Sequence, residues 1–600
     1  MSKKIVILGA GYAGIKAAKT LNKKFKKDNS VEITLIDQHQ HHILLTELHE
    51  VAGNRIDSNG VKVSLAEVFD NTKVNLVQDK VTGIDTDKQQ LLSENSIYNY
   101  DYLVLAVGSE PTYFNIPGME EHAFDLWSLE DAKEINGQIR TMFSLASQEK
   151  DINKRKELLT FTVGGGGFTG IEVVGEIAQW TDDLCKLYNI PKEEVSIKVI
   201  EAMDKILPVL SKKRIAKAER YLRKELGVEL LLNSTICKVE EDGVIINSCQ
   251  LEGNHIVDTP QQEDTKIRTQ TLIWTGGVKA KEFVKKLGLN LNHRDRIEVN
   301  NYLQTSIENI YAIGDNTYFE TDDNWVMPQL VEAAVQAGKS VANNIYAEIS
   351  GKELKEFKPQ LHGVMVSIGA NYAVAELKPT PKITLPISGF LAMMTKHLIN
   401  MHYLFEVNGL SLIWEYIEHQ FADVKGGIGM LVRHLSKKSG TYWLAILRIF
   451  LGLRFLIEGI HKVQEGWLTG SEGQLVSGAS SVLWSDGTPQ IYIDLMKTFV
   501  APNQVLFQKV LVLTELGVGL SLIFGCLTVL GGLAAMGMSA NFIIGALGSE
   551  AGIWEPVWLF LISLTMLSGA GKAFGLDYYL IPWLFNLSKK KVNYDKDIAV

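Results

Sequence analysis

Residues 163–170 read VGGGGFTG, and this stretch decides the fold of the chain. An apolar segment, residues 158–163, leads into it, and a helical pattern continues from Ile171. A strand, a glycine-rich turn and a helix in this order form the context in which GxGxxG indicates dinucleotide binding. The three glycines of the pattern are Gly165, Gly167 and Gly170. The stretch therefore predicts the start of a nucleotide-binding βαβ unit.

The same pattern occurs near the N-terminus, where residues 8–14 read LGAGYAG. Its glycines are Gly9, Gly11 and Gly14. A β-branched run at residues 4–8 precedes the turn, and the second strand, residues 32–36, ends at Asp37. In such units the first glycine permits the tight turn, the second admits a pyrophosphate and the third lets the helix pack on the strand. Asp37 is then placed to accept hydrogen bonds from an adenosine ribose; the alternative is a solvated loop residue in an ordinary α/β sheet.

The second unit has its own acidic residue at a strand end. Residues 195–200 form the predicted strand, and Glu201 follows it. A carboxylate there repels a 2′-phosphate, so Glu201 favours NADH over NADPH; the alternative is a surface charge. Two dinucleotide turns in one chain predict two dinucleotides, one that gives electrons and one that receives them.

Composition describes a large globular protein with a different C-terminal region. Its 600 residues suffice for several domains, with 46% hydrophobic and 22% charged residues overall. Charged residues become sparse after about residue 440, where long apolar runs take over. A net charge of −9 without a basic stripe argues against a nucleic-acid partner. The apolar run at residues 5–10 is short and enters the glycine turn, so we expect no cleaved signal peptide.

The chain has four cysteines, and they form no CxxC or CxxxxC pair. They are Cys185, Cys237, Cys249 and Cys526. This spacing predicts neither a metal site nor a redox dithiol, and it fits a reduced, cytosolic setting for residues 1–440.

The C-terminal third is predicted to meet a membrane. Residues 383–436 are rich in apolar and aromatic side chains but too polar to span, which favours amphipathic structure lying on a bilayer. The alternative is a helical hairpin that packs in the core. Four later segments have about the length that a ~30 Å hydrocarbon layer requires. They are residues 441–460, 509–528, 531–547 and 554–574.

Positive charges orient these segments. Arg433, Lys437 and Lys438 precede the first one, and residues 589–591 are three lysines after the last. The positive-inside rule then places both ends in the cytoplasm and the loop at residues 462–508 outside.

Four charged residues fall within the predicted spans, where charges are costly and often mark function. They are Arg448, Arg454, Glu458 and Glu515. Arg454 and Glu458 are four apart and can pair on one helix face. A structural ion-pair cluster and a substrate or quinone pocket remain equal alternatives.

At this point the motifs resemble a known family. GAGYAG, GGGGFTG, IWTGGV at residues 273–278 and YAIGD at residues 311–315 resemble the type II NADH:quinone dehydrogenases, flavoproteins with two dinucleotide-binding domains. The resemblance covers about residues 1–435. The segments LRIFLGLRFLIEGIHKV and TELGVGLSLIFGCLT, at residues 447–463 and 514–528, resemble the DoxX group of four-helix membrane proteins.

The resemblance assigns the first turn to FAD and the second to NADH. On the FAD side it implies Gly9, Gly11, Gly14, Asp37, Gly108, Gly314 and Asp315. On the NADH side it implies Gly165, Gly167, Gly170, Glu201 and Gly276. It also places Glu172 near the nicotinamide and the flavin. The alternative for Glu172 is a favourable charge in the first turn of a helix.

For the quinone, the family usually shows AQxxxQ on the helix after the GD motif, which is Gly314–Asp315 in this chain. Here residues 331–336 read VEAAVQ, so Gln336 is present and Glu332 replaces the first glutamine. The two positions are one helical turn apart and can face one pocket. We expect Glu172, Glu332 or both to relay protons to the quinol, and the substitution leaves the type of quinone open.

These observations predict an α/β fold with two Rossmann-like domains, of which the FAD domain is discontinuous. Amphipathic helices and a four-helix transmembrane bundle follow. The predicted FAD domain comprises residues 1–112 and 301–380, and the NADH domain, residues 113–300, is inserted between these two segments. A membrane-interface region at residues 381–438 and a DoxX-like domain at residues 439–600 complete the chain.

The resemblance implies a non-pumping enzyme that moves electrons from NADH through FAD to menaquinone or demethylmenaquinone. It sits in a bacterial cell membrane, could supply extracellular acceptors, and is compatible with a homodimer. Disulfide reductases need a redox-active cysteine pair after the first βαβ unit, and they are disfavoured because residues 39–51 contain no cysteine. Sulfide:quinone reductases need cysteines near the flavin, including one late in the flavoprotein part, and they are disfavoured because residues 250–525 contain none. A flavin-binding membrane redox sensor or assembly factor is the alternative from another class.

Overall fold

The computed structural model divides into two compact units, Met1–Met430 and Leu431–Val600. It describes residues 2–94, 96–252, 255–258, 264–292, 294–321, 323–380, 383–422, 442–470, 487–547, 552–567, 569–572 and 574–581. Residues 423–438 of the predicted interface region lie outside the described residues, and so do Arg433, Lys437, Lys438 and the lysines at 589–591.

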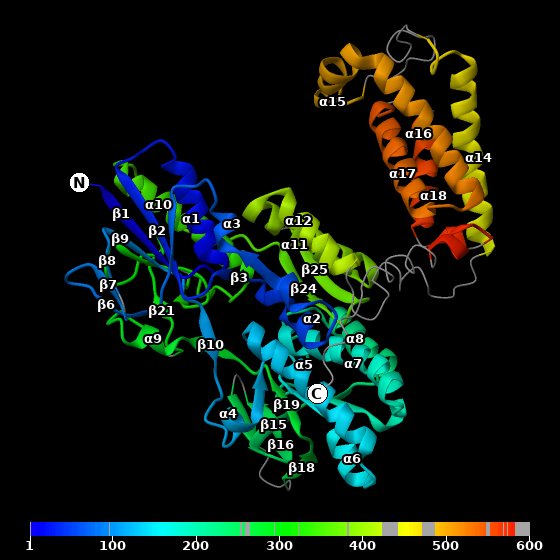
Figure 1. Ribbon diagram of the computed structural model, residues 1–600. Coiled ribbons are helices and arrows are strands. Elements are labelled where there is room, and N and C mark those ends of the chain that lie inside the picture. Colours follow the sequence, from blue (N-terminus) through cyan, green and yellow to red (C-terminus); the bar gives the residue numbers. More distant parts are fainter. Residues whose placement is uncertain are drawn as a thin grey trace, which may run out of the picture. The chain divides into compact units, whose positions relative to one another are not determined.

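A parallel five-stranded sheet, in the order β22-β9-β1-β2-β5, carries the first glycine turn. Its strands are β1 (Lys3–Leu8), β2 (Val31–Asp37), β5 (Val74–Gln78), β9 (Tyr102–Leu105) and β22 (Ile310–Ala312). Helices α1 (Tyr12–Lys24) and α10 (Val331–Ile349) pack side by side against it (Figure 1). Because β22 follows the whole second sheet in sequence, the first domain is discontinuous, as predicted.

A second parallel sheet, in the order β11-β19-β12-β13-β14, repeats this plan. Its strands are β11 (Ala123–Asp125), β12 (Thr160–Gly164), β13 (Ser196–Ile200), β14 (Glu229–Leu231) and β19 (Thr271–Trp274). Helices α5 (Leu129–Gln148) and α7 (Phe168–Tyr188) pack together in this half. In both sheets the strand before the glycine turn is central and neighbours the second strand of its own βαβ unit. This confirms the predicted α/β class.

Smaller elements complete the first unit. Antiparallel pairs and sheets are formed by β3 (His41–Ile43) with β4 (Lys62–Ser64), β6 (Val81–Asp85) with β7 (Gln90–Ser93) and β8 (Ile97–Asn99), β10 (Ser109–Pro111) with β20 (Val278–Ala280), and β15 (Ser234–Glu240) with β16 (Gly243–Glu252), β17 (His255–Asp258) and β18 (Thr265–Arg268). The short helices include η1 (Leu45–Glu47), α2 (Leu48–Ala52), α3 (Leu65–Val68), α4 (Met119–His122), α6 (Ile152–Leu158), α8 (Lys212–Arg220) and α9 (Glu282–Lys285). One cluster of buried apolar side chains runs through the helices of both halves, so the two halves share a core.

The region predicted to lie at the membrane surface begins as a strand. β26 (Ile383–Ser388) pairs with β25 (Ala373–Thr380), which also pairs with β24 (Gly363–Ser367). Helices α11 (Phe390–Asn408) and α12 (Leu410–Ile417) and the helical turn η5 (Glu418–Ala422) follow. Each of the two helices buries one face and leaves large apolar side chains exposed on the other, so neither alternative for this region describes it completely.

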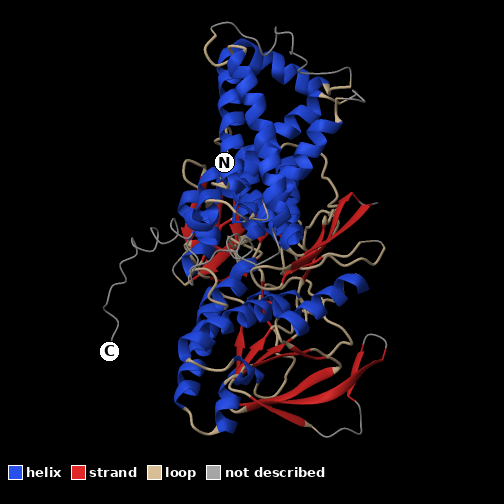
Figure 2. Cartoon of the chain, turned by 90° about the vertical axis from the view of Figure 1, so that its right-hand side faces the viewer, coloured by secondary structure: helices blue, strands red, loops and turns tan. Residues whose placement is uncertain are grey.

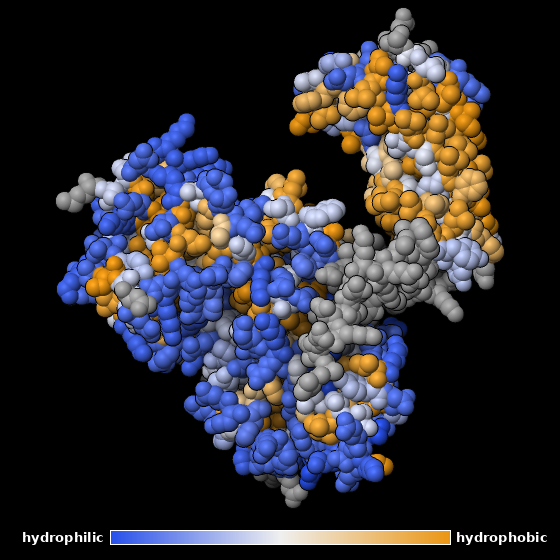
Figure 3. Space-filling view, viewed as in Figure 1, coloured by the Kyte–Doolittle hydropathy of each residue, from blue (hydrophilic) through white to orange (hydrophobic). Residues whose placement is uncertain are grey.

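The second unit is helical (Figure 2). One helix overlaps each of the four predicted spans: α14 (Tyr442–Gln464), α16 (Gln504–Phe524), α17 (Thr528–Gly545) and α18 (Trp554–Met566). Hydrophobic side chains cover most of the visible face of this unit (Figure 3). Helices α15 (Gln490–Leu495), η6 (Met496–Val500) and η7 (Ala501–Asn503) lead directly into α16.

Among the described residues, two helical stretches are long and apolar enough to cross a membrane, Gln490–Phe524 and Thr528–Gly545. The predicted last span is too long, because α18 ends at Met566 and is only 13 residues. α14 has the length but not the apolar composition, since Arg448, Arg454 and Glu458 fall within it.

Candidate functional site

The two glycine turns have the same backbone geometry. Gly9 has a φ of +107° and Gly165 has a φ of +109°. Residues with a Cβ atom rarely adopt this backbone conformation, whereas glycine does so readily. Each N–H closes the turn on the neighbouring strand: Gly9 donates to the Ile36 carbonyl at 2.8 Å, and Gly165 donates to the Ile200 carbonyl at 2.9 Å. The first glycine of both motifs is therefore required by the turn itself.

The third glycine of each motif brings the helix onto its turn. A Cβ on Gly14 would lie 1.9 Å from the Gly9 carbonyl oxygen, and a Cβ on Gly170 would lie 2.0 Å from that of Gly165. Both distances are far below van der Waals contact. Each helix therefore starts against the first glycine of its own motif.

The middle glycines face open space. Gly11 and Gly167 are the N-cap residues of α1 and α7, and a Cβ on either would meet nothing within 4 Å. In both helices the cap makes no side-chain hydrogen bond, and the first turn carries no acidic residue. The uncapped N–H groups and the helix dipole fit the pyrophosphate of a dinucleotide. The residues present therefore fit FAD or NADH at either turn.

The two acidic residues at the strand ends also correspond. Asp37 accepts a hydrogen bond from the Ala10 N–H at 2.6 Å and one from the His39 N–H at 2.8 Å. Glu201 accepts from the Gly166 N–H at 2.5 Å and from the Met203 N–H at 2.8 Å. Each carboxylate is thus fixed beside its glycine turn and keeps lone pairs for the hydroxyls of a ribose.

The GD motif lies next to the first turn. Gly314 has a φ of +81°, and a Cβ there would come within 3.5 Å of the Ala13 side chain. Asp315 accepts from the Ser109 hydroxyl at 3.3 Å, and burial raises the pKa of its carboxyl above the ordinary value. Gly108, with a φ of +72°, lies beside this segment, because its N–H donates to Oδ1 of Asn316 at 3.3 Å. The residues predicted for the FAD side therefore gather at one edge of the first sheet.

Gly276, predicted on the NADH side, has a packing role in the structure. A Cβ at this position would lie 2.2 Å from the Trp274 ring. The indole Nε1–H of Trp274 donates to the Thr112 carbonyl at 2.8 Å, which holds the ring in place. The glycine therefore makes room for the tryptophan at the end of β19.

Glu172 lies one turn into α7 and is largely buried. Its Oε1 accepts hydrogen bonds from the Ser367 N–H at 3.2 Å and the Ser367 hydroxyl at 3.1 Å. Its Oε2 is 3.7 Å from Nδ1 of His49. Burial raises the pKa of Glu172 to about 7, so its carboxyl exchanges a proton near neutral pH. This value suits a group that takes up and releases protons during turnover.

Glu332 and Gln336 contact each other, with Gln336 Nε2 donating to Glu332 Oε1 at 3.4 Å. The segment before β24 holds both: the His362 N–H and ring contact Glu332, and Gln360 exchanges two hydrogen bonds with Gln336. The side chain of Glu332 is 34% exposed.

Glu172 and Glu332 are held at opposite ends of one strand. Glu332 contacts His362 at the start of β24, and Glu172 contacts Ser367 at its end. Five residues of strand span about 17 Å. The structure therefore joins Glu332 with Gln336 but does not bring Glu172 to them.

Sequence reasoning missed a buried group of ionisable residues around Glu172, which we call the ionic cluster. It consists of Glu47, His49, Glu50, Arg55, Glu172, Glu176 and Lys396. Except for Glu172, each member is at most 9% exposed. One signal was available: Lys396 is the only lysine or arginine in residues 383–424.

Close backbone contacts fix the cluster between the two halves. A Cβ on Gly53, which ends α2, would lie 2.4 Å from Cβ of Glu176. A Cβ on Gly175 would lie 2.4 Å from the Gly369 amide nitrogen. Helix α7 is thus packed against α2 on one side and against the loop after β24 on the other.

Three of the four charges predicted within the spans form ion pairs, whereas Arg448 is fully buried and donates to the Phe574 carbonyl at 3.3 Å. Arg454 and Glu458 form the predicted ion pair at 2.5 Å, and Arg454 also contacts Glu555. Glu515 is 1% exposed and pairs with Lys462 at 2.5 Å. For Arg454, Glu458 and Glu515 these contacts are those of a structural ion-pair cluster.

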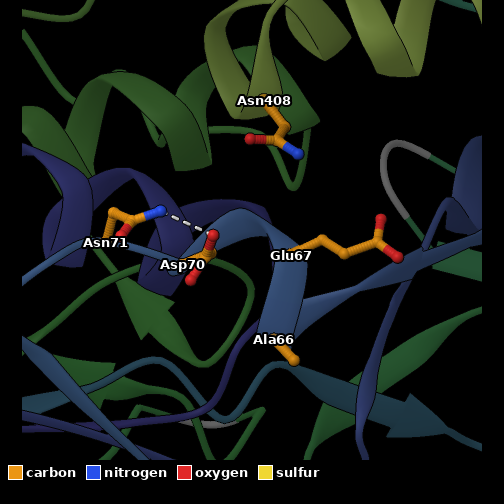
Figure 4. Close-up of a pocket in the computed structure, with 5 residues that line it drawn as sticks. All are labelled: Ala66, Glu67, Asp70, Asn71 and Asn408. Atoms are coloured by element: carbon orange, nitrogen blue, oxygen red, sulfur yellow. Dashed lines mark hydrogen bonds between the residues drawn. The ribbon is translucent and has the colours of Figure 1, made fainter.

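The first unit has a surface pocket of about 550 Å³. It is lined by Ala66, Glu67, Asp70, Asn71 and Asn408 (Figure 4). Asn71 donates to Asp70 across its edge. None of the predicted site residues lines it, and we assign it no role.

Comparisons with known proteins agree with this geometry. The pyridine nucleotide-disulphide oxidoreductase family profile matches residues 3–338, and the profile of the TQO small subunit DoxD matches residues 443–596. Type II NADH:quinone oxidoreductase of Staphylococcus aureus (strain MSSA476) is 31% identical over 422 residues, covering 69% of this chain and 98% of that protein. The enzyme of strain NCTC 8325 / PS 47 matches with the same identity and coverage.

Solved structures share the fold. NDH2 from Plasmodium falciparum, in complex with NADH, has a TM-score of 0.61 at 19% identity and covers 70% of this chain and 99% of that one. Sulfide:quinone oxidoreductase from Aquifex aeolicus has a TM-score of 0.55 at 18% identity and covers 68% and 92%. At such identities the likeness concerns the fold alone. The family profile matches more than half of this chain, and the sequence identity extends over nearly the whole length of a relative. This chain therefore belongs to the type II NADH:quinone oxidoreductases, with a DoxD-type unit at its C-terminal side.

Proposed function

We propose that the protein oxidises NADH and reduces a membrane quinone, with FAD as the cofactor of the first glycine turn and NADH as the substrate of the second. The observation that carries this proposal is the pair of matched turns in a chain of this family. Bound FAD supplies two-electron chemistry between nicotinamide and quinone. The chain itself positions the nucleotides, selects NADH and handles protons.

The first turn binds FAD and the second binds NADH. The N–H groups at the start of α1, behind Gly11, hold the FAD pyrophosphate, and Asp37 accepts from the ribose. The start of α7, behind Gly167, holds the NADH pyrophosphate. Glu201 accepts from the adenosine ribose and repels a 2′-phosphate, which selects NADH.

Glu172 holds and releases the proton that accompanies quinone reduction. Its carboxyl is poised by burial, with a pKa of about 7, and Ser367 fixes its Oε1 with two hydrogen bonds. Glu332 and Gln336 bind the quinone from α10, at the other end of β24 from Glu172, so the proton has to travel from Glu172 to reach it. Their side chains are joined at 3.4 Å and anchored to residues 360–362.

The membrane contact of the first unit comes from α11 and α12. Their outer faces expose large apolar side chains at 49–74% of full exposure: Leu391, Leu398, Ile399, Phe405, Leu410 and Trp414. An apolar helix face of this kind inserts into the interface of a bilayer. The second unit spans the cell membrane of a bacterium several times and keeps both ends of the chain in the cytoplasm. Menaquinone or demethylmenaquinone is the acceptor, and extracellular acceptors can follow.

Turnover by purified protein in membranes tests the assignment. NADH oxidation should depend on a menaquinone analogue and should be at least tenfold faster than NADPH oxidation. Glu201→Ala should abolish most of this preference, because it removes the charge that repels the 2′-phosphate. Gly167→Trp should abolish NADH oxidation, since its side chain fills the space at the N-terminus of α7. Unchanged kinetics in both variants would contradict the NADH site.

The role of the second unit requires a separate experiment in cells. Deletion of residues 440–600 should change the quinone preference or the reduction of extracellular iron. If neither changes while NADH oxidation is retained, the second unit serves only as an anchor.

A further inference from the structure

The helix that starts at the first glycine turn is also in contact with α11. Tyr12 is the first residue of α1, directly after Gly11, so its N–H is one of the groups that fit a pyrophosphate. Tyr12 is 8% exposed and has two aromatic neighbours. The His42 ring lies edge-on to it at 4.7 Å between ring centres, and the Tyr403 ring of α11 lies at 4.9 Å. Helix α11 therefore contacts the first residue of the FAD-binding helix.

His42 connects Tyr403 with the glycine turn itself. Nε2 of His42 lies 3.0 Å from the Tyr403 hydroxyl. The ring is 2% exposed, and a neutral imidazole has one acceptor nitrogen and one N–H donor. The Tyr403 O–H donates to the acceptor, and the N–H is left for the backbone of Ala10, between the first two glycines of the motif. The Tyr403 hydroxyl therefore fixes the tautomer of His42 and, through it, the turn.

Two lysines extend this contact along α1. Lys16 Nζ pairs with the Glu406 carboxylate at 2.7 Å. Lys19 Nζ donates to the Val407 carbonyl in the last turn of α11, where a cation also suits the helix dipole. The three α1 residues that reach α11 are spaced by four and three positions, so they lie on one face of α1. The contact is therefore continuous over two turns of the helix.

The start of α1 is thus fixed from two directions. Its own turn fixes it through Gly14, which rests on the Gly9 carbonyl oxygen. Helix α11 fixes it from a segment far along the chain, since Lys16 and Glu406 are 390 positions apart. Hydrogen bonds from the helix N-terminus to a pyrophosphate weaken steeply when the donors move out of line. The α11 contacts therefore bear on how firmly the first turn can hold its nucleotide.

We propose that Tyr403 and Glu406 of α11 are positioning residues for FAD, which hold the first turn of α1 where its N–H groups meet the pyrophosphate. The inference rests on the proposed placement of FAD at the first glycine turn. Loss of either contact should loosen FAD. Coupling between two binding events is reciprocal, so bound FAD should in turn stabilise the C-terminal half of α11.

The first test measures the release of FAD from the full-length, FAD-loaded protein by the fluorescence of the released flavin. In Tyr403→Phe the ring against Tyr12 is kept and only the hydroxyl is lost, so FAD should leave about fivefold faster. Tyr416→Phe is the matched control, because it removes another tyrosine–histidine hydrogen bond, of 2.8 Å to His397, between α12 and α11. Its release rate should stay within about twofold of the wild type.

An exchange of charges tests Glu406 in the same assay. Glu406→Lys places an ammonium beside Lys16 and should speed the release of FAD about threefold. The double variant Lys16→Glu with Glu406→Lys brings opposite charges together again. Its release rate should return to within about twofold of the wild type, which a general loss of packing would not allow.

Hydrogen exchange measures the reciprocal effect without turnover. Amides of residues 399–408 should exchange about tenfold more slowly in the FAD-loaded wild type than in the apo protein, and Tyr403→Phe should lose most of this difference.

Three outcomes would overturn the proposal. They are a wild-type release rate in Tyr403→Phe, equal acceleration in Tyr403→Phe and Tyr416→Phe, and a double variant that releases FAD as fast as Glu406→Lys. Exchange in residues 399–408 that ignores FAD would do the same. If instead Gly14→Ala retained FAD as firmly as the wild type, the proposed placement of FAD at the first turn would be contradicted.

Discussion

At the scale of the residue, Glu172 shows how burial creates a useful proton affinity. The side chain stands in the first turns of α7, where an exposed glutamate would be permanently ionised. Removal from water raises its pKa to about 7, while the hydrogen bonds of Ser367 and the charge of Lys396 limit the shift. The group can therefore change protonation without leaving the physiological range.

This shift makes the stability of the first unit depend on pH. Between about pH 4.5 and pH 7 the folded protein keeps a proton on Glu172 that the unfolded chain has released. The stabilisation is fully present below about pH 4.5 and is lost as the pH rises through 7, a change of about 3 kcal/mol. In Glu172→Gln this contribution to the pH dependence should be missing. This contribution is measured from the melting temperatures of the purified wild type and of Glu172→Gln between pH 4.5 and 8. If the melting temperatures of the two proteins changed with pH in parallel, the raised pKa of Glu172 would be contradicted.

At the scale of the element, α1 and α7 begin with the same glycine turn geometry. Both begin at a glycine without a side-chain cap, and both rest on the first glycine of their own turn. Strands β1 and β12 place these helix starts at the same edge of their sheets. The correspondence allows one substitution to be made twice with different consequences.

Gly14→Ala and Gly170→Ala should separate the two sites. An added Cβ pushes each helix off its turn, because the carbonyl oxygen is only 1.9 Å or 2.0 Å away. Gly14→Ala should purify with little FAD, whereas Gly170→Ala should keep FAD and show a KM for NADH raised about tenfold. Gly137→Ala is the control: its Cβ meets nothing within 4 Å in α5, and alanine should stabilise the helix by about 1 kcal/mol. Absorbance of bound FAD and steady-state kinetics report both effects.

At the scale of the whole molecule, local patterns were sufficient for the sheets but not for the cluster. Strand, turn and helix follow one another in sequence, so Gly9 and Gly165 could be predicted from their neighbours alone. The ionic cluster is assembled over long distances: His49 and Lys396 are 347 positions apart. No sequence pattern states that Glu47 and Glu50 are buried. The end of α18 was also missed, because an apolar composition does not show where a helix stops.

The apolar face of α11 and α12 should matter for access to lipid quinones rather than for anchoring. In Trp414→Glu the full chain should remain in the membrane fraction, because the second unit holds it there. The KM for a long-chain menaquinone in vesicles should rise about tenfold, while that for a short water-soluble analogue stays unchanged. Leu187→Glu, at another exposed apolar side chain, serves as the control. An equal effect on both quinones would contradict a role in membrane contact.

The contacts of Gly53 and Gly175 have a consequence for motion. At Gly53 and Gly175 the chain packs closely on both sides of α7, and these contacts oppose a hinge rotation of the half that carries the second turn. We infer that NADH binds to a preformed site at the start of α7, without the domain closure that many nucleotide enzymes use. Structures with and without NADH should superimpose through α7.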